Sequence, residues 1–144
     1  MQKAIIFDID ETIAHKHPSR GFREYDKVAL DTPIEPTLNV LKLYFNAGYK
    51  ILFVTSRREI CRLETIEWLE KYACNEFELF MRPEKQSKKE KYIDSDLVKL
   101  ELYEKHIKGI YDIEAVFEDR KIVKEMWVKQ GLWVFDTNQN NLIY

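Results

Sequence analysis

The sequence predicts an α/β fold in which a mostly parallel sheet is flanked by helices. Short apolar runs of strand length, rich in β-branched and aromatic residues, recur along the chain. Segments with helical periodicity lie between these runs, and such alternation is typical of parallel sheets. With 144 residues, 45% of them hydrophobic, the chain has enough apolar material for one core, so we expect a single domain over residues 1–144.

Five apolar runs are the expected strands of a central five-stranded parallel sheet. They cover residues 3–7, 50–54, 77–81, 113–117 and 132–135. Each has the length of an ordinary strand, and none is long enough to be read as a helix on its own.

Four helices are expected between and after these strands. Pro36 suits the first turn of the first helix and Gly48 its end, with Leu38, Leu41 and Phe45 forming an apolar stripe. The other three are expected at residues 58–72, 95–107 and 121–130, where apolar residues share one helix face. These helices would cover the sheet.

Two longer connections remain, at residues 13–35 and 82–94. The first contains His15, His17, Arg20 and Arg23, and the second contains five basic residues between Arg82 and Lys91. Neither is long enough for a separate cap domain, so we expect an open site.

Composition excludes several classes of protein. The net charge of −2 gives the chain no overall basic signature for nucleic acid. Cys61 and Cys74 lack metal-ligand spacing and are expected to be reduced thiols. No apolar run approaches membrane length, and the N-terminal apolar segment is too short for a signal peptide. A cytoplasmic protein without membrane association is therefore expected.

Polar residues follow the expected strands at the point where each strand ends. Ligands of parallel sheets bind beyond the carboxyl ends of the strands, so these residues form the candidate site. They are Asp8 and Asp10 after the first strand, Thr55, Ser56 and Arg57 after the second, Arg82 after the third, and Glu118 and Asp119 after the fourth.

Asp8 and Asp10 are two residues apart and would project into one crevice. Adjacent carboxylates repel each other and need a cation, and Mg²⁺ prefers oxygen ligands. Asp8 can then attack phosphorus, while Asp10 protonates the leaving oxygen and later activates water. The alternative is a turn in which Asp10 or Thr12 only binds the backbone.

The other strand ends also allow two interpretations. Glu118 and Asp119 could complete a magnesium site, or they could form an exposed acidic turn at a helix start. Thr55, Ser56 and Arg57 suit phosphate oxygens, although a hydroxyl there could equally cap a helix.

The order DxDxT, hydrophobic-Thr, helix lysine and acidic pair resembles the haloacid-dehalogenase phosphohydrolase superfamily, which has a Rossmann-like fold. Within it, the chain is similar to the 3′-phosphatase domain of phage polynucleotide kinase. The segments RGFREYD, DLVKLELYEKHI and AVFEDRKIVKEMWVKQGLWVF carry this likeness.

The resemblance implies a role for each matching residue. Asp8 would be the nucleophile and a metal ligand, and Asp10 the general acid/base that also lends its backbone carbonyl to Mg²⁺. Lys99 would neutralise the phosphate, although helix lysines are usually solvated. The remaining implied roles are phosphate binding by Thr55, metal binding by Asp119 and by Glu118 directly or through water, and substrate binding by Arg57, Arg82 and either Arg20 or Arg23. Substrate binding by Ser56 is expected only from its hydroxyl at the strand end.

Three positions depart from the phage domain: Glu11 and Ser56 stand where it has glycine, and Glu118 where it has aspartate. No GxxxxGK[ST] motif occurs, so no P-loop kinase activity is expected.

The expected function is removal of a 3′-phosphate from polynucleotide ends during nucleic-acid repair. The basic residues 82–91 could follow a phosphate backbone or simply be a solvated loop. The first alternative is a phosphatase of free nucleotides or other small phosphoesters. The second is a non-catalytic binding module with the same fold.

Overall fold

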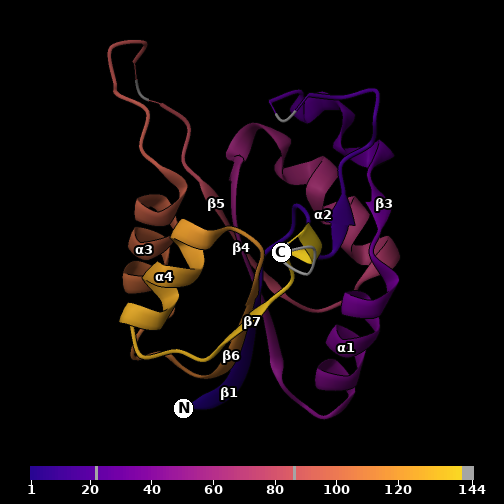
Figure 1. The fold of residues 1–144 in the computed structure, drawn as a ribbon, viewed down its shortest axis with the longest axis vertical. Coiled ribbons are helices and arrows are strands. Elements are labelled where there is room, and N and C mark those ends of the chain that lie inside the picture. Colours follow the sequence, from indigo (N-terminus) through magenta and orange to yellow (C-terminus); the bar gives the residue numbers. More distant parts are fainter. Residues whose placement is uncertain (22, 86, 141–144) are drawn as a thin grey trace.

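The central sheet has five parallel strands in the order β5-β4-β1-β6-β7, which puts the N-terminal strand in the middle (Figure 1). The structure is a computed structural model and describes residues 1–140 except 22 and 86. Phe22 of the RGFREYD stretch and the last four residues of the expected domain therefore lie outside the described residues. The strands are β1 (Gln2–Phe7), β4 (Lys50–Arg58), β5 (Glu78–Arg82), β6 (Tyr111–Glu118) and β7 (Val134–Asp136).

Helices cover both faces of this sheet. Helices α1 (Glu35–Asn46) and α2 (Arg62–Tyr72) lie on one face, and α3 (Ser95–His106) and α4 (Lys121–Lys129) lie on the other (Figure 1). None of the helices in the described part of the chain is long and apolar enough to cross a membrane.

The alternation of side chains along each strand divides the core into two layers. In β1, Ile5 and Phe7 pack toward α1 and α2, whereas Ala4 and Ile6 pack toward α3 and α4. Residues 51–54 of β4 alternate in the same way. Because both faces of the sheet are covered, the strands read as continuous apolar runs in the sequence.

The predicted α/β class and five-stranded parallel sheet are confirmed. The prediction of a helix from residue 58 is wrong at its start, because β4 continues to Arg58 and a 3-10 helix, η2 (Glu59–Cys61), precedes α2. Strand β4 continues past a register shift and pairs again with β5 through Arg58 and Arg82. Thr55, Ser56 and Arg57 therefore lie within β4 rather than after it.

The two long connections differ in structure. The first, predicted as a loop over residues 13–35, contains the two-stranded sheet of β2 (Ala14–His15) and β3 (Thr32–Pro33) and the 3-10 helix η1 (Tyr25–Leu30). In the second, no helix or strand is found among the described residues 83–94, and the segment extends from the body of the molecule (Figure 1). Both connections border the carboxyl edge of the sheet.

Candidate active site

Asp8 lies at the carboxyl edge in the middle of the sheet. The last β1 residue, Phe7, pairs with Phe53 of β4 on one side and with Phe117 of β6 on the other. The Asp8 backbone N–H continues this ladder with a 2.9 Å hydrogen bond to the Phe117 carbonyl. The first residue after β1 is thus fixed by the backbone between two neighbouring strands.

Both carboxylate oxygens of Asp8 accept hydrogen bonds. Lys99 Nζ lies 2.8 Å from Oδ1, and the Thr12 hydroxyl donates to Oδ2 over 3.1 Å. Thr12 in turn lies 2.9 Å from the hydroxyl of Thr137, which follows β7. Because Asp8 is 5% exposed and held from two sides, its carboxylate has a defined orientation.

Lys99 bridges Asp8 to the acidic end of β6. Its ammonium also lies 2.7 Å from Glu118 Oε2, and both residues are buried. Burial alone would lower the pKa of Lys99, but the charges of Asp8 and Glu118 outweigh it and raise that pKa. Lys99 is therefore a buried cation, unlike the solvated lysine that is usual on a helix.

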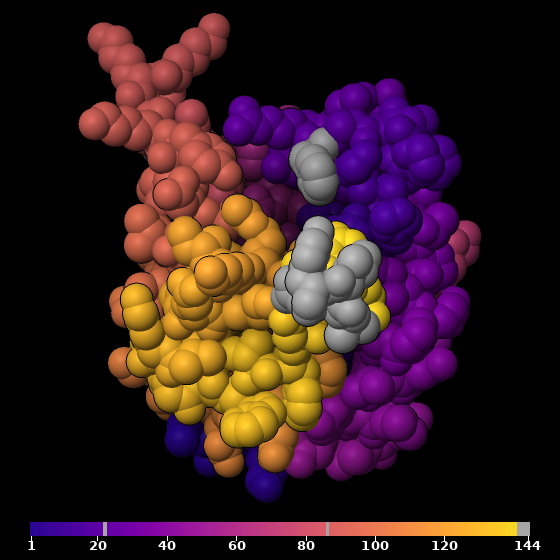
Figure 2. Space-filling model, viewed as in Figure 1, coloured from indigo at the N-terminus to yellow at the C-terminus, as the bar shows by residue number. Residues whose placement is uncertain are grey.

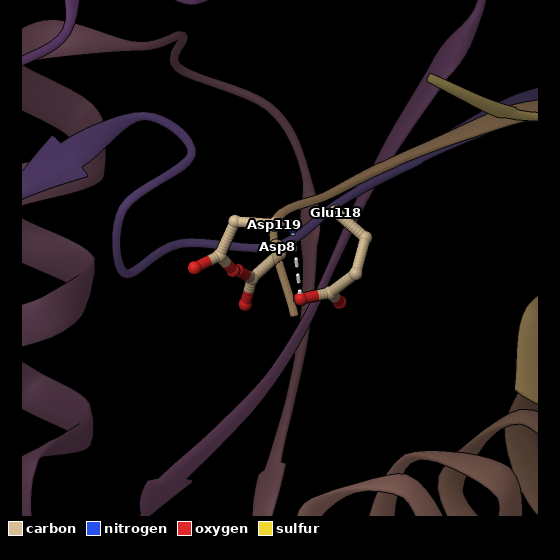
Figure 3. Close-up of side chains that lie close together, drawn as sticks. All are labelled: Asp8, Glu118 and Asp119. Atoms are coloured by element: carbon tan, nitrogen blue, oxygen red, sulfur yellow. Dashed lines mark hydrogen bonds between the residues drawn. The ribbon is translucent and has the colours of Figure 1, made fainter. Parts of the chain in front are cut away.

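Asp8, Glu118 and Asp119 form an acidic cluster that could hold a metal ion. One carboxylate oxygen from each lies within 4.8 Å of the others, and the three side chains converge in Figure 3. Burial, and then the charge of Asp8, raise the pKa of Glu118 to about 7 and the pKa of Asp119 to about 9. Both burial and the neighbouring carboxylates therefore disfavour the ionised forms of Glu118 and Asp119.

The donor set fits a hard divalent cation. Oδ1 of Asp119 is buried and has no hydrogen-bond partner among the described residues. Both Glu118 oxygens are already bonded, one to Lys99 and the other to the Asp119 and Arg120 backbone N–H groups. Asp119 therefore offers a ligand atom that is not yet bonded, whereas Asp8 and Glu118 would contribute oxygens that already accept hydrogen bonds, directly or through water.

Asp10 has a different environment from Asp8. Arg57 donates to it through Nη2 at 2.8 Å, and Arg20 lies 3.3 Å away. Behind them, Asp31 accepts from Arg20 at 2.7 Å and from Arg57 at 3.0 Å. Burial works against the charged form of Asp10, but the two guanidinium groups outweigh it and hold the pKa of that carboxyl below its usual range.

The sequence left open whether Arg20 or Arg23 binds substrate. In the structure the two side chains have different environments. Arg20 is 3% exposed and committed to Asp31 and Asp10, whereas Arg23 is exposed and lines the crevice above Asp8. Arg23 is therefore the one whose side chain is available to a ligand. Arg57 also lines the crevice, but its guanidinium is bound to acidic partners.

The remaining predicted residues lie around this centre. Ser56 lines the crevice, and the buried Thr55 hydroxyl accepts a 3.1 Å hydrogen bond from the Arg57 backbone N–H. No acceptor for the Thr55 O–H is found among the described residues, so this hydroxyl can donate to a ligand. Arg82 lines a neighbouring cavity instead, and donates to the backbone carbonyls of Ser56 and Ile93.

The crevice has a volume of about 360 Å³. Sequence reasoning missed five of the residues that line or support it: Tyr25, Asp31, Tyr92, Ser95 and Arg120. Arg120 donates a 2.8 Å hydrogen bond to Ser95 across the crevice rim. Its position directly after the Glu118-Asp119 pair is the one sequence signal that could have identified it.

Glu11, which stands where the phage domain has glycine, lies in a turn with an unusual backbone conformation. Its φ of 60° lies in the left-handed region that glycine adopts without strain. The Glu11 carboxylate accepts from the Lys16 backbone N–H at 3.1 Å and contacts His15 Nδ1 at 2.8 Å. These contacts hold the turn that returns the chain from Asp10 toward β2.

Comparison with known proteins agrees with this geometry. A family model described as the polynucleotide kinase PNKP phosphatase domain matches residues 2–142. A putative bifunctional polynucleotide kinase/RNA ligase of Autographa californica nuclear polyhedrosis virus is 34% identical over 128 residues, which is 87% of this chain. The chain spans only 18% of the length of that relative.

Solved structures show the same fold. The chain matches a protein in the Pnkp1/Rnl/Hen1 RNA repair complex with a TM-score of 0.86 and 29% identity, covering 95% of this chain and 42% of that one. It also matches D,D-heptose 1.7-bisphosphate phosphatase from B. bronchiseptica with a TM-score of 0.63, covering 99% of this chain and 86% of that one; at 10% identity this supports the fold alone. The chain is therefore a phosphatase of the haloacid-dehalogenase fold and belongs to the family of the polynucleotide kinase PNKP phosphatase domain.

Proposed function

We propose that the protein is a magnesium-dependent phosphomonoesterase that uses Asp8 as nucleophile and removes 3′-phosphate from polynucleotide ends. The observation that carries the proposal is the buried Asp8, held by Lys99 at 2.8 Å beside two further carboxylates. Three carboxylates around one ammonium make a site that needs a cation before a phosphate can enter.

Asp8, Asp119 and, directly or through water, Glu118 would hold the magnesium ion, together with the Asp10 backbone carbonyl that the family resemblance implies. Magnesium, when bound, supplies positive charge that lowers the repulsion between these carboxylates and the substrate phosphate.

In the first step, a carboxylate oxygen of Asp8 forms a bond to phosphorus while the bond from phosphorus to the 3′-oxygen breaks. Lys99 and the free O–H of Thr55 offset the negative charge on the phosphoryl oxygens. The leaving oxygen takes a proton from Asp10. Because Arg57 and Arg20 keep Asp10 ionised in the free protein, that proton arrives with the substrate, whose phosphate has an ordinary second pKa of about 6.

In the second step, water attacks the phosphorus of the aspartyl phosphate and Asp10 takes a proton from this water. The bond between phosphorus and Asp8 breaks, which releases inorganic phosphate and restores the Asp8 carboxylate. Asp10, whose pKa is held below its usual range, is ionised at neutral pH and can accept this proton.

The comparisons and the rim of the crevice support a polynucleotide end as the substrate. The family is described by a polynucleotide kinase and the matched structure is an RNA repair complex, and Arg23 and Arg120 line the crevice. The rival is a small phosphoester, since a crevice of about 360 Å³ accepts a single nucleotide as readily as the end of a polymer.

The test measures phosphate release from 3′-phosphorylated DNA, 3′-phosphorylated RNA and a nucleoside 3′-monophosphate, each with magnesium and with chelator. We expect release to need magnesium and kcat/KM to be higher for at least one oligonucleotide than for the mononucleotide. Equal kcat/KM for all three would favour the small-phosphoester alternative, and full activity in chelator would contradict the metal assignment.

A further inference from the structure

A second and larger cavity adjoins the catalytic crevice. It has a volume of about 700 Å³, and Arg23, Tyr25 and Tyr92 line both cavities. Figure 2 shows this face hollowed between the salmon-coloured residues that precede α3 and the indigo residues that follow β1. A ligand whose phosphate reaches Asp8 can therefore extend past the two tyrosines into this second cavity.

The second cavity is cationic on a protein whose net charge is −2. Seven basic and four acidic side chains line it, an excess of three positive charges. Two of the acidic residues, Glu59 and Glu84, already pair with arginines. For five of the basic residues no ion pair is found in the described part of the chain: Arg23, Arg82, Lys85, Lys91 and Lys105.

The floor of this cavity is apolar. Leu79, Phe80 and Met81 of β5 contribute to it, together with Val98 and Leu102 of α3. Apolar surface beneath a ring of cations suits a ligand that has flat rings and a charged backbone. The volume lies within the range of about 300–1,000 Å³ that is usual for ligand pockets.

Tyr92 is the aromatic ring at the junction of the two cavities. It is 54% exposed, and the Arg82 guanidinium lies 4.6 Å from the centre of its ring. Arg82 also donates to the Ser56 carbonyl at 3.1 Å and to the Ile93 carbonyl at 2.6 Å. Arg82 thus ties the segment that carries Tyr92 to the end of β4 and fixes the ring beside the crevice.

Arg23 contacts the same ring more loosely. Its guanidinium lies 5.5 Å from the Tyr92 ring centre, and no hydrogen bond or ion pair of its side chain is found among the described residues. A flat group can displace Arg23 from the ring, and the freed guanidinium then lies beside the crevice where it can bind a phosphate oxygen.

We propose that the second cavity binds the single-stranded nucleotides that precede the terminal 3′-phosphate, with the terminal base stacked on Tyr92. The proposal rests on the proposed function and deepens it by naming the substrate as an unpaired strand end. Stacking platforms inside cationic grooves are typical of sites that bind single strands without sequence preference. In a duplex the nucleotides that precede the terminal one are paired and stacked on both faces, so they can enter the second cavity only as an unpaired strand.

The main test combines two enzymes with two substrates. Wild type and Tyr92→Ala are assayed on a single-stranded 3′-phosphorylated oligonucleotide and on the same strand with an abasic terminal residue. Loss of the base should lower the wild-type kcat/KM about 5- to 150-fold. Tyr92→Ala should show a similar loss on the intact strand but less than about a twofold further loss on the abasic strand.

Two further variants separate stacking from structure. Tyr92→Phe keeps the ring and should stay within about threefold of wild type. Trp133→Ala removes another aromatic residue, which is 70% exposed and lies outside both cavities. It should leave kcat/KM unchanged on both the intact and the abasic strand. Equal losses of Tyr92→Ala on intact and abasic strands, or no loss on either, would overturn the stacking proposal while leaving the phosphatase function intact.

The failure of the proposed function gives a different result. If wild type releases phosphate from small phosphoesters but from no oligonucleotide, the proposed substrate is wrong and this site is rejected with it. If wild type cleaves a 3′-phosphate within a blunt duplex as fast as one on a single strand, only the single-strand proposal fails.

The cationic lining has its own test. A variant with alanine at Lys85, Lys91 and Lys105 should reduce the slope of log kcat/KM against log salt concentration by at least about 0.7 on the oligonucleotide. Alanine at Lys42, Lys121 and Lys129, which lie on α1 and α4 and line neither cavity, is the matched control. An equal change of slope in both variants would contradict a backbone path through the second cavity.

Discussion

The two aspartates that follow β1 lie in opposite electrostatic environments although only one residue separates them. Asp8 shares a cluster with Glu118 and Asp119, where three carboxylates surround one ammonium. Asp10 belongs to a closed group in which two carboxylates, its own and that of Asp31, meet two guanidiniums. The first group has fewer positive than negative groups. The second has equal numbers of both without any ligand.

This contrast teaches how one turn can supply two different carboxylates. The charged neighbours of Asp8 come from α3 and from the end of β6, far along the chain, whereas those of Asp10 come from the first connection and β4. The environment of Asp8 suits metal binding and nucleophilic attack. The environment of Asp10 holds its carboxylate in a fixed position, which suits proton transfer. The following predictions test this division.

The largest effect is expected for Asp8→Asn. The amide is nearly isosteric but cannot form an acyl phosphate, so kcat should fall by at least about four powers of ten. Thermal unfolding should show a folded protein. Phosphatase activity close to wild type would reject Asp8 as the nucleophile.

Asp119→Asn should affect activity and stability in opposite directions. Loss of a metal ligand should lower activity at limiting magnesium by at least about a hundredfold, with a higher magnesium concentration needed for half-maximal rate. In chelator, removal of a carboxyl group that is costly to bury should raise Tm by roughly 2–4 °C. The control is Asp112→Asn, an exposed residue of β6, the strand that Asp119 follows. A lower Tm in chelator would contradict the excess of negative charge.

Asp31→Asn should weaken the balanced group. Asp31 is buried and bonds both arginines, so the substitution leaves their charges less compensated and should lower Tm by roughly 5–10 °C. We also expect kcat to fall about tenfold because Asp10 loses its fixed partners. Asp26→Asn, an exposed change in the same connection, serves as the control. Unchanged stability would show that the group is not held through Asp31.

The pH dependence of stability should distinguish the two groups without any substitution. The pKa values of Glu118 and Asp119 rise from 4.5 and 3.8 to about 7 and about 9, so the native state binds more protons than the unfolded state between those limits. In chelator, this contribution to stability is present below about pH 4 and is lost as the pH rises to about 9.

Asp10 has the opposite sign, because its lowered pKa gives a contribution that persists above its ordinary pKa of 3.8 and is lost only in acid. Thermal unfolding from pH 5 to pH 9 should therefore show a falling Tm in chelator and a smaller fall with magnesium. An identical fall in both conditions would argue against metal binding at the acidic cluster.

The sequence predicted the sheet well because each buried strand is a continuous apolar run, as β1 and β4 show. It predicted the location of Asp8, Glu118 and Asp119 because parallel strands bring their carboxyl ends to one edge. The place of Lys99 in the site was indicated only by the family resemblance, and neither the resemblance nor periodicity predicted its burial.

The closed group around Asp10 was not predicted. Arg20 and Arg57 are separated from Asp31 by 11 and 26 residues, and no periodic pattern links them. The start of α2 was misplaced because residues 55–58 extend β4 through a register shift that depends on pairing with β5. Both features depend on contacts between distant segments, which local patterns do not encode.

Glu11 has a consequence for how fast substrate arrives. Its left-handed backbone costs about 1 kcal/mol relative to glycine, and glycine would lose a similar amount through the greater freedom of the unfolded chain. Because Glu11→Gly also removes the carboxylate contacts with Lys16 and His15, it should lower Tm slightly. The carboxylate, however, lines the crevice through which a phosphate must pass. Removing it should raise kcat/KM about twofold at low salt while kcat stays constant, and high salt should abolish the difference. The side chain at this turn would then act on the rate of association and leave the chemical step unaffected.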